Sequence, residues 1–196
     1  MRKAGSVQKM TAAALLMALG MIIPMFSPLK IVLEPASFTL ASHVPLFLSM
    51  FISPWVSIAV SLGTTAGFFL AGAFPPVVVL RAASHIIFVI IGSFWLQRHS
   101  SVLSSYARLT AFSFVIALIH ALCETVVSSI FYMGGLMSTA NYNHGFLWSV
   151  LLLVGGGSIV HSMFDFAIAL LILQALAKQK STHSLFANSP YTIKSI

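Results

Sequence analysis

Residues 77–92 read VVVLRAASHIIFVIIG, an apolar stretch that is interrupted by Arg81 and, four positions later, by His85. The apolar character continues to position 97, which gives about 20 residues, the length that an α-helix needs to cross a bilayer. A charged side chain at the bilayer centre costs about 2.5 kcal/mol or more. The stretch therefore predicts a membrane-spanning helix whose polar face is shielded from lipid by other parts of the chain.

The composition of the whole chain agrees with this prediction. Of its 196 residues, 59% are hydrophobic and only 7% are charged, whereas a soluble domain carries roughly 25% charged residues. We therefore expect an all-α integral membrane protein with one domain, 1–180, and a polar cytoplasmic tail, 181–196. Apolar runs of sufficient length predict six transmembrane helices, at 8–27, 37–53, 55–73, 77–97, 109–133 and 146–177.

The basic residues predict the orientation of these helices. Eight of the ten lie near the N-terminus, between the fourth and fifth predicted helices or near the C-terminus: Arg2, Lys3, Lys9, Arg98, Arg108, Lys178, Lys180 and Lys194. Because cytoplasmic loops carry an excess of Lys and Arg, we expect a plasma-membrane protein with both termini in the cytoplasm. This distribution explains the net charge of +7, and we expect no nucleic-acid partner.

Three predicted helices carry a pair of polar residues. The fourth, fifth and sixth contain, in that order, Arg81 and His85, His120 and Glu124, and His161 and Asp165. The spacing of four places both members of a pair on one helical face. We therefore expect these three helices to face one another around a polar pocket that opens outward, with Asp165 nearer the cytoplasm and out of its reach.

A purely structural interpretation of the same residues stays open. His161 and Asp165 can neutralise each other, and Glu124 can hold Arg81 in place of a ligand. For Arg81 itself a ligand is favoured, because a guanidinium binds a carboxylate bidentately. Further candidates for substrate contact lie near the predicted outer surface: His43, Tyr142 and Asn143. For His43, a role in packing is the alternative.

The sequence lacks the motifs of the common enzyme classes. It has no GxxxxGK[ST] loop for ATP hydrolysis and no GxSxG elbow. It has no HExxH or Cys/His metal spacing, and a metal site would require the pairs on the fifth and sixth helices to converge. We therefore expect no enzyme, no metal and no cofactor, but a binding subunit that partner proteins energise.

The first predicted helix contains a candidate docking face. Within AAALLMA, residues 12–18, Ala14 and Ala18 lie four positions apart on one side of the helix. Small residues at this spacing let another helix approach closely in lipid. Packing against the protein's own helices would use the same residues, so the spacing alone does not decide between the two.

Over residues 8–178 the chain resembles the substrate-binding S-components of energy-coupling factor (ECF) vitamin transporters. The similarity lies in the size, the six predicted spans, the Ala14 and Ala18 spacing and the residue pattern of two segments. LEPASFTLASHVPLFLSMFISP, residues 33–54, and FPPVVVLRAASHIIFVIIG, residues 74–92, look most like the niacin-type S-components.

The resemblance implies a protein that captures a vitamin from outside the cell, and niacin is the favoured vitamin. It implies docking through the alanine face on a transmembrane coupling protein that carries two cytoplasmic ATPases. It places vitamin binding in the region of Arg81, His85, Glu124, Tyr142 and Asn143. Other carboxylate vitamins such as pantothenate would suit Arg81 equally well, and a stand-alone proton-coupled carrier of a small organic anion is the alternative.

Overall fold

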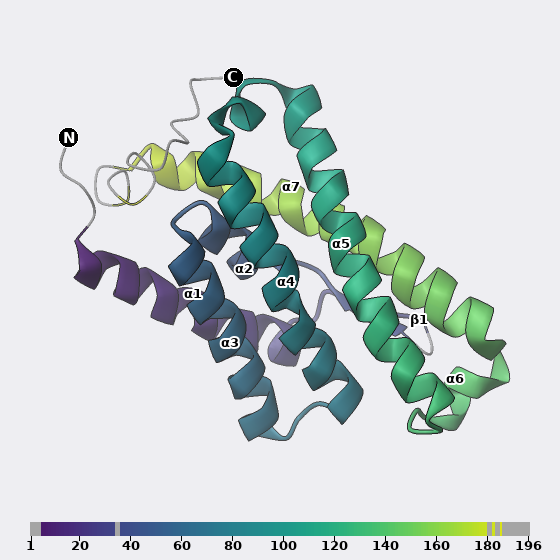
Figure 1. Ribbon diagram of the computed structural model, residues 1–196. Helices are drawn as coiled ribbons and strands as arrows, with labels where there is room; N and C mark the ends of the chain where they lie inside the picture. Colours follow the sequence, from purple (N-terminus) through teal and green to yellow (C-terminus); the bar gives the residue numbers. More distant parts are fainter. Residues whose placement is uncertain (1–4, 34–35, 180–181, 183–184, 186–196) are drawn as a thin grey trace.

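The computed structural model describes residues 5–33, 36–179, 182 and 185, so most of the predicted tail lies outside the described residues. The first half of the chain consists of α1 Ser6–Phe26, β1 Lys30–Leu33, β2 Ala36–Thr39, α2 Val44–Met50, α3 Pro54–Ala71 and α4 Pro76–Arg98 (Figure 1). The second half consists of the 3₁₀-helix η1 Ser100–Ser104, α5 Tyr106–Met133, α6 Thr139–Asn143, the π-helix η2 Leu147–Gly156 and α7 Gly157–Ala177.

Five helices in the described part of the chain are long and apolar enough to cross a membrane. They are Ser6–Phe26, Pro54–Ala71, Pro76–Arg98, Tyr106–Met133 and Leu147–Leu176. They coincide, with small shifts at the ends, with five of the six predicted spans. The prediction of a helical membrane protein is therefore confirmed.

The prediction of one helix over residues 37–53 is wrong. Thr39 ends strand β2, Ala41 lies in a turn with a φ of 68°, and the helix α2 covers only Val44–Met50. Seven helical residues span about 10 Å, far less than the hydrocarbon core of about 30 Å. All residues of α2 are buried. A continuous apolar run has the same appearance in a buried core segment and in a span, which is why the sequence did not separate them.

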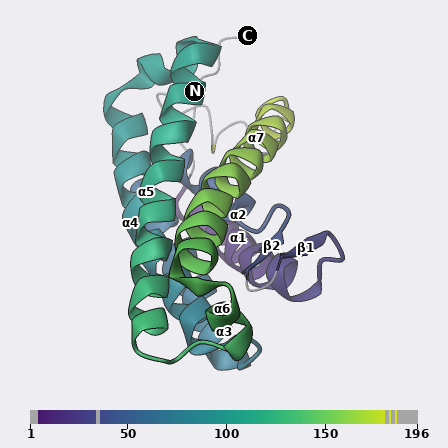
Figure 2. The ribbon, with the colours of Figure 1, turned by 90° about the vertical axis from the view of Figure 1, so that its right-hand side faces the viewer.

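The strands β1 and β2 form an antiparallel hairpin, in which Lys30 pairs with Thr39 and Ile31 with Phe38. This small sheet departs from the predicted all-α class. Figure 2 shows α7 between α5 and the hairpin. The hairpin contacts α7 near its start, where the Phe38 ring lies beside Gly157 and His161.

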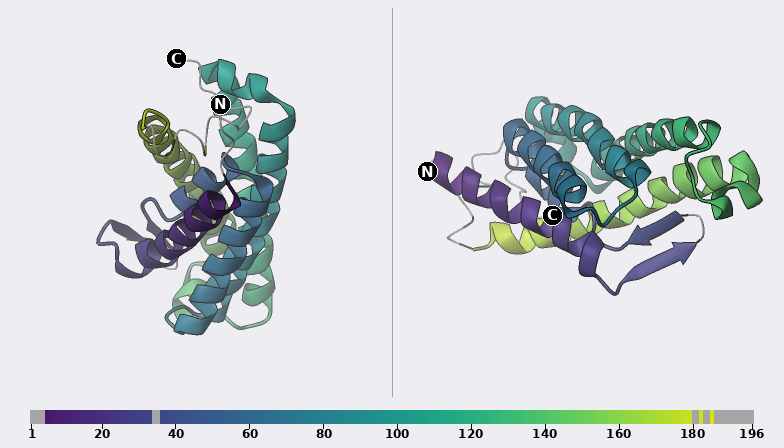
Figure 3. Two further views of the ribbon diagram at one scale, coloured as in Figure 1. Left: turned by 90° about the vertical axis from the view of Figure 1, so that its left-hand side faces the viewer. Right: turned by 90° about the horizontal axis from the view of Figure 1, so that it is seen from below.

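The long helices form two layers with α2 enclosed between them. In the right-hand view of Figure 3, α3, α4 and α5 make one layer, and α1 and α7 cross on its other side. Helix α2 contacts α1, α3, α4 and α7. Its Phe47 ring lies 5.6 Å from Phe88 of α4 and 5.2 Å from Phe166 of α7, centroid to centroid. Because lipid is as apolar as these side chains, close packing rather than exclusion from water stabilises this core.

Helix α1 packs on α3 through glycines. A Cβ atom at Gly63 would lie 2.5 Å from the Sδ atom of Met17, and one at Gly67 would lie 1.7 Å from that of Met21. A side chain at either position would therefore displace the methionine side chain that packs on it. The close approach fixes one face of α1 against the protein.

The ends of the helices separate into two groups. The start of α1, the α4–α5 connection and the end of α7 lie toward the top and left of Figure 1, while the α3–α4 connection and α6 lie at the bottom. The described basic residues of the first group include Lys9, Arg98, Arg108 and Lys178. This grouping agrees with the positive-inside rule, and the cytoplasmic location of the termini stays a prediction.

Candidate functional site

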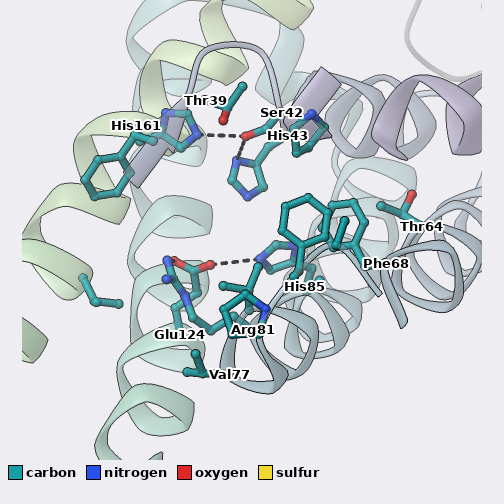
Figure 4. A pocket seen from close by; sticks show the side chains of 18 of the residues that line it. Thr39, Ser42, His43, Thr64, Phe68, Val77, Arg81, His85, Glu124 and His161 are labelled. Carbon is teal, nitrogen blue, oxygen red and sulfur yellow. Dashed lines mark hydrogen bonds and ion pairs between the residues drawn. The ribbon is translucent and has the colours of Figure 1, made fainter. Parts of the chain in front are cut away.

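A cavity of about 480 Å³ lies between α1, α3, α4 and the β1–β2 hairpin and also touches α5 and α7 (Figure 4). Small-molecule pockets have volumes of roughly 300–1,000 Å³. At the lower end of the molecule, the connections and α6 contribute further lining residues: Ala73, Phe74, Pro75, Leu136, Met137, Ser138 and Asn141. Its polar lining residues include Arg81, His85, Glu124, His43 and His161.

Glu124 of α5 joins three helices at the wall of the cavity. Nη2 of Arg81 donates a hydrogen bond to its Oε2 atom at 2.9 Å, and Nε2 of His85 lies 3.2 Å from its Oε1 atom. Ser158 of α7 also donates to Oε2. The side chain of Glu124 is only 5% exposed, so the Arg81 guanidinium offsets the cost of a buried carboxylate. The structure thus brings α4, α5 and α7 together around their polar faces.

His120 lies behind this wall and does not line the cavity. Its side chain is 1% exposed. Its Nε2 atom lies 3.2 Å from Nε2 of His85 and 3.5 Å from Oε1 of Glu124. His120 therefore extends the polar cluster into the protein interior.

Asp165 of α7 holds the turn that precedes α2. Its Oδ1 atom accepts a hydrogen bond from the backbone N–H of Ala41 at 2.7 Å, and Oδ2 accepts one from the backbone N–H of His43 at 2.8 Å. Oδ2 also lies 3.2 Å from Nδ1 of His43 and 3.3 Å from Nε2 of His161. Asp165 does not line the cavity, but it positions two histidines that do.

Four imidazoles gather between the two carboxylates. The ring centroid of His43 lies 4.9 Å from that of His85, 4.6 Å from that of His120 and 5.0 Å from that of His161. Ser42 bridges two of these rings, at 3.2 Å from Nδ1 of His43 and 3.0 Å from Nε2 of His161, as the dashed lines in Figure 4 mark. We call His43, His85, His120 and His161 the histidine cluster.

The two residues predicted for the outer loop, Tyr142 and Asn143, are placed differently from the expectation. Tyr142 does not line the cavity, because its hydroxyl donates to the carbonyl of Tyr132 at 3.0 Å and accepts from the backbone N–H of Met137 at 3.3 Å. Asn143 is exposed and also lies outside the lining. Their neighbour Asn141 lines the cavity instead.

Sequence reasoning missed several lining residues from the first half of the chain, although it found His43, Arg81 and His85 there. The missed residues are Lys30, Phe38, Ser42, Thr64, Phe68 and Phe74 among others. They lie on the hairpin, on α3 and in connections, where no periodic pattern pointed to a common site. The apolar run over residues 37–53 predicted a second span, so the sequence did not indicate the hairpin that carries Phe38.

The hairpin approaches α7 at a glycine. A Cβ atom at Gly157 would lie 2.4 Å from Cζ of Phe38, and the Phe38 ring lies 5.5 Å from that of His161. Gly157 follows directly on the π-helix η2, and π-helical segments occur frequently at functional sites. The absence of a side chain at this position lets the hairpin close one side of the cavity.

The chain is 40% identical over 177 residues to the niacin transporter NiaX of Lactococcus lactis subsp. cremoris (strain MG1363), and the match covers 90% of this chain and 78% of the relative. No family model matches the chain, and no solved structure does.

Proposed function

Because the chain belongs to the family of the niacin transporter NiaX, we propose that it is the substrate-binding S-component of an ECF-type importer and that it takes up niacin. In this proposal the chain binds the vitamin from outside the cell. A transmembrane coupling protein and two cytoplasmic ATPases supply the energy. The chain itself carries out no chemical reaction.

The position of Arg81 is the main support for an anionic cargo. Its side chain is 17% exposed and lines the cavity, and its Nη2 atom pairs with Glu124. A guanidinium has five N–H donors, so this one ion pair leaves donors for a ligand carboxylate. Nε of Arg81 has no hydrogen-bond partner among the described residues, but it is buried, so it meets a ligand only if the guanidinium turns. The carboxylate of niacin would use the accessible N–H donors of the guanidinium.

The remaining lining suits a flat aromatic ring. Phe68 and Phe74, whose centroids lie 4.4 Å apart, form an apolar patch of the cavity. Aromatic rings pack on one another in tilted or offset arrangements. Asn141 and Ser138 line the cavity with an amide and a hydroxyl group, which can donate to the pyridine nitrogen of niacin.

The exposed side of α1 suits a partner helix. Ala13, Leu16 and Gly20 are buried against the rest of the chain, whereas Ala14 is exposed and Ala18 half-buried. Small exposed residues allow close helix contact in lipid. This geometry supports Ala14 and Ala18 as the docking face for the coupling protein.

Ligand binding to the detergent-purified chain tests the proposal. We expect niacin to bind with a sub-micromolar dissociation constant, and nicotinamide, which lacks the carboxylate, to bind at least about tenfold more weakly, which corresponds to about 1.4 kcal/mol. Pantothenate serves as the second comparison. If pantothenate binds and niacin does not, the cargo assignment is wrong.

The buried carboxylates and imidazoles also favour a second candidate, a stand-alone proton-coupled carrier. Ionisable groups within membrane helices commonly form proton relays, and here Glu124, Asp165 and the histidine cluster are connected. Reconstitution of the chain alone in liposomes separates the candidates. Uptake of niacin driven by a pH gradient, without any ATPase, would establish the carrier and overturn the S-component.

A further inference from the structure

We infer that His85, His120 and Glu124 form a binding site for a divalent transition-metal ion of the zinc class, with His43 as the fourth ligand. These four residues come from α4, α5 and the turn before α2. Each offers a nitrogen or oxygen atom within 4.8 Å of those of the others. The site lies at the inner wall of the cavity.

The three shortest separations match the edges of a tetrahedral site. Nε2 of His85 lies 3.2 Å from Nε2 of His120 and 3.2 Å from Oε1 of Glu124, and the third edge, from His120 to Glu124, is 3.5 Å. Zinc binds imidazole nitrogen and carboxylate oxygen at about 2.0–2.2 Å, so two ligands of a tetrahedral ion lie about 3.3–3.6 Å apart. A single ion can therefore reach all three atoms with little movement.

Hydrogen bonding alone does not satisfy this triangle of atoms. A neutral imidazole nitrogen either donates or accepts. If both Nε2 atoms carry a proton, the two N–H groups share Oε1 of Glu124 as acceptor, and the two nitrogens lie 3.2 Å apart without a hydrogen bond between them. If only one does, the unprotonated nitrogen and Oε1 of Glu124 place two lone pairs at 3.2 to 3.5 Å. Three lone pairs that converge on one metal ion remove this conflict.

The surroundings orient the ligand atoms. Arg81 and Ser158 both bind Oε2 of Glu124, which leaves Oε1 for the ion. Nδ1 of His43 faces Oδ2 of Asp165 at 3.2 Å, so the opposite nitrogen, Nε2, is the one that is free to turn toward the site. A carboxylate behind a ligating histidine is the usual second shell of zinc sites.

The donor set and the charge favour this class of ion. Imidazole and carboxylate ligands without thiolates suit Zn²⁺, Ni²⁺ or Co²⁺, whereas Mg²⁺ and Ca²⁺ prefer all-oxygen sites. Within the described residues the site and its neighbours hold two carboxylates, Glu124 and Asp165, against one guanidinium, that of Arg81. A divalent cation offsets this excess of negative charge.

Metal content and Co²⁺ spectroscopy of the full chain test the inference. The protein is purified without a polyhistidine tag, stripped with EDTA, loaded with Zn²⁺ and passed over a desalting column. We expect one Zn²⁺ per chain. Loading with Co²⁺ instead should give the intense visible absorption of tetrahedral coordination, and excess Zn²⁺ should abolish it.

Matched histidine variants locate the ion. His85→Gln and His120→Gln should each weaken Zn²⁺ binding by more than about 100-fold, because even second-shell changes cost about 10–100-fold. His99 and His144 are exposed and distant from the cluster in sequence, and the double variant His99→Gln/His144→Gln should retain the full stoichiometry.

Two results would overturn the inference. One is a wild-type chain that retains no stoichiometric Zn²⁺ and shows no tetrahedral Co²⁺ spectrum, a result that does not depend on the folding of any variant. The other is Zn²⁺ that is lost from the surface double variant and kept by both cluster variants. Since no vitamin is present in these measurements, their outcome is independent of niacin binding.

Discussion

The carboxylate of Asp165 accepts a hydrogen bond from the backbone N–H of Ala41 at 2.7 Å, across 124 positions of the sequence. Ala41 has a φ of 68°, a left-handed conformation that costs a residue with a side chain about 1–2 kcal/mol. Charge-assisted hydrogen bonds to Ala41 and His43 offset this cost. Asp165 thereby fixes the start of α2 and the orientation of His43.

Replacing Asp165 with asparagine is expected to destabilise the protein. One carboxylate oxygen becomes an NH₂ group, so a donor faces a backbone N–H of either Ala41 or His43. Hydrogen bonds to charged groups contribute about 1.5–3 kcal/mol, and we expect a loss of stability of this size. A lower midpoint of thermal unfolding in detergent would register it.

Ser162 provides the control on the same helix. Its hydroxyl is buried and has no hydrogen-bond partner among the described residues, so Ser162→Ala should leave the midpoint nearly unchanged. An Asp165→Asn variant as stable as Ser162→Ala would show that the Asp165 contacts to the turn contribute little.

The fold could be predicted wherever an apolar run spans the membrane as one helix. The 40% identity to NiaX likewise confirms the resemblance to the niacin-type family that two sequence segments indicated. The structure of residues 30–53 could not be predicted, because apolar residues such as Phe38 and Phe47 occur equally in a hairpin, in a short core helix and in a span. Only tertiary contacts such as that between Asp165 and Ala41 distinguish these cases.

The same distinction applies to the candidate site, where local spacing could be predicted and contacts between distant residues could not. The spacing of four in Arg81 and His85 placed both on one helical face, and the structure brings that face to Glu124. The helix positions also predicted that Asp165 is out of reach of the pocket, and Asp165 does not line the cavity. They did not predict that Asp165 binds the turn at Ala41, because that contact joins residues 124 positions apart.

Replacing Arg81 with lysine separates ligand binding from charge balance. Lysine keeps the positive charge beside Glu124 but loses the planar fork that binds a carboxylate bidentately. We expect niacin affinity to fall at least about tenfold, which corresponds to 1.4 kcal/mol, while the unfolding midpoint changes little. Isothermal titration with niacin and a thermal melt give both values. Unchanged affinity would leave Arg81 as a structural partner of Glu124 alone.

A bulky residue at Ala14 should abolish transport and spare binding. Ala14 is exposed on α1, and an indole there would prevent the close approach of a partner helix. Ala14→Trp is therefore expected to bind niacin normally and to fail in uptake by liposomes that contain the coupling protein and its ATPases. Leu15→Trp, at a neighbouring position that is 63% exposed, is the control and should transport. If Ala14→Trp also loses binding, this face packs within the protein.

A methyl group at Gly157 should loosen the hairpin from the cavity. Its Cβ atom would lie 2.4 Å from Cζ of Phe38, whereas no atom lies within 4 Å of a Cβ at Gly156. Overpacking of this kind costs about 1–3 kcal/mol, so Gly157→Ala should lower both the unfolding midpoint and niacin affinity, and Gly156→Ala should lower neither.

The cost of Gly157→Ala should disappear when Phe38 is also shortened, because Phe38→Ala removes the colliding ring. Midpoints and affinities of the two single variants and the double variant form a cycle. If Gly157→Ala is equally costly with and without Phe38, the hairpin does not close against α7 at this glycine.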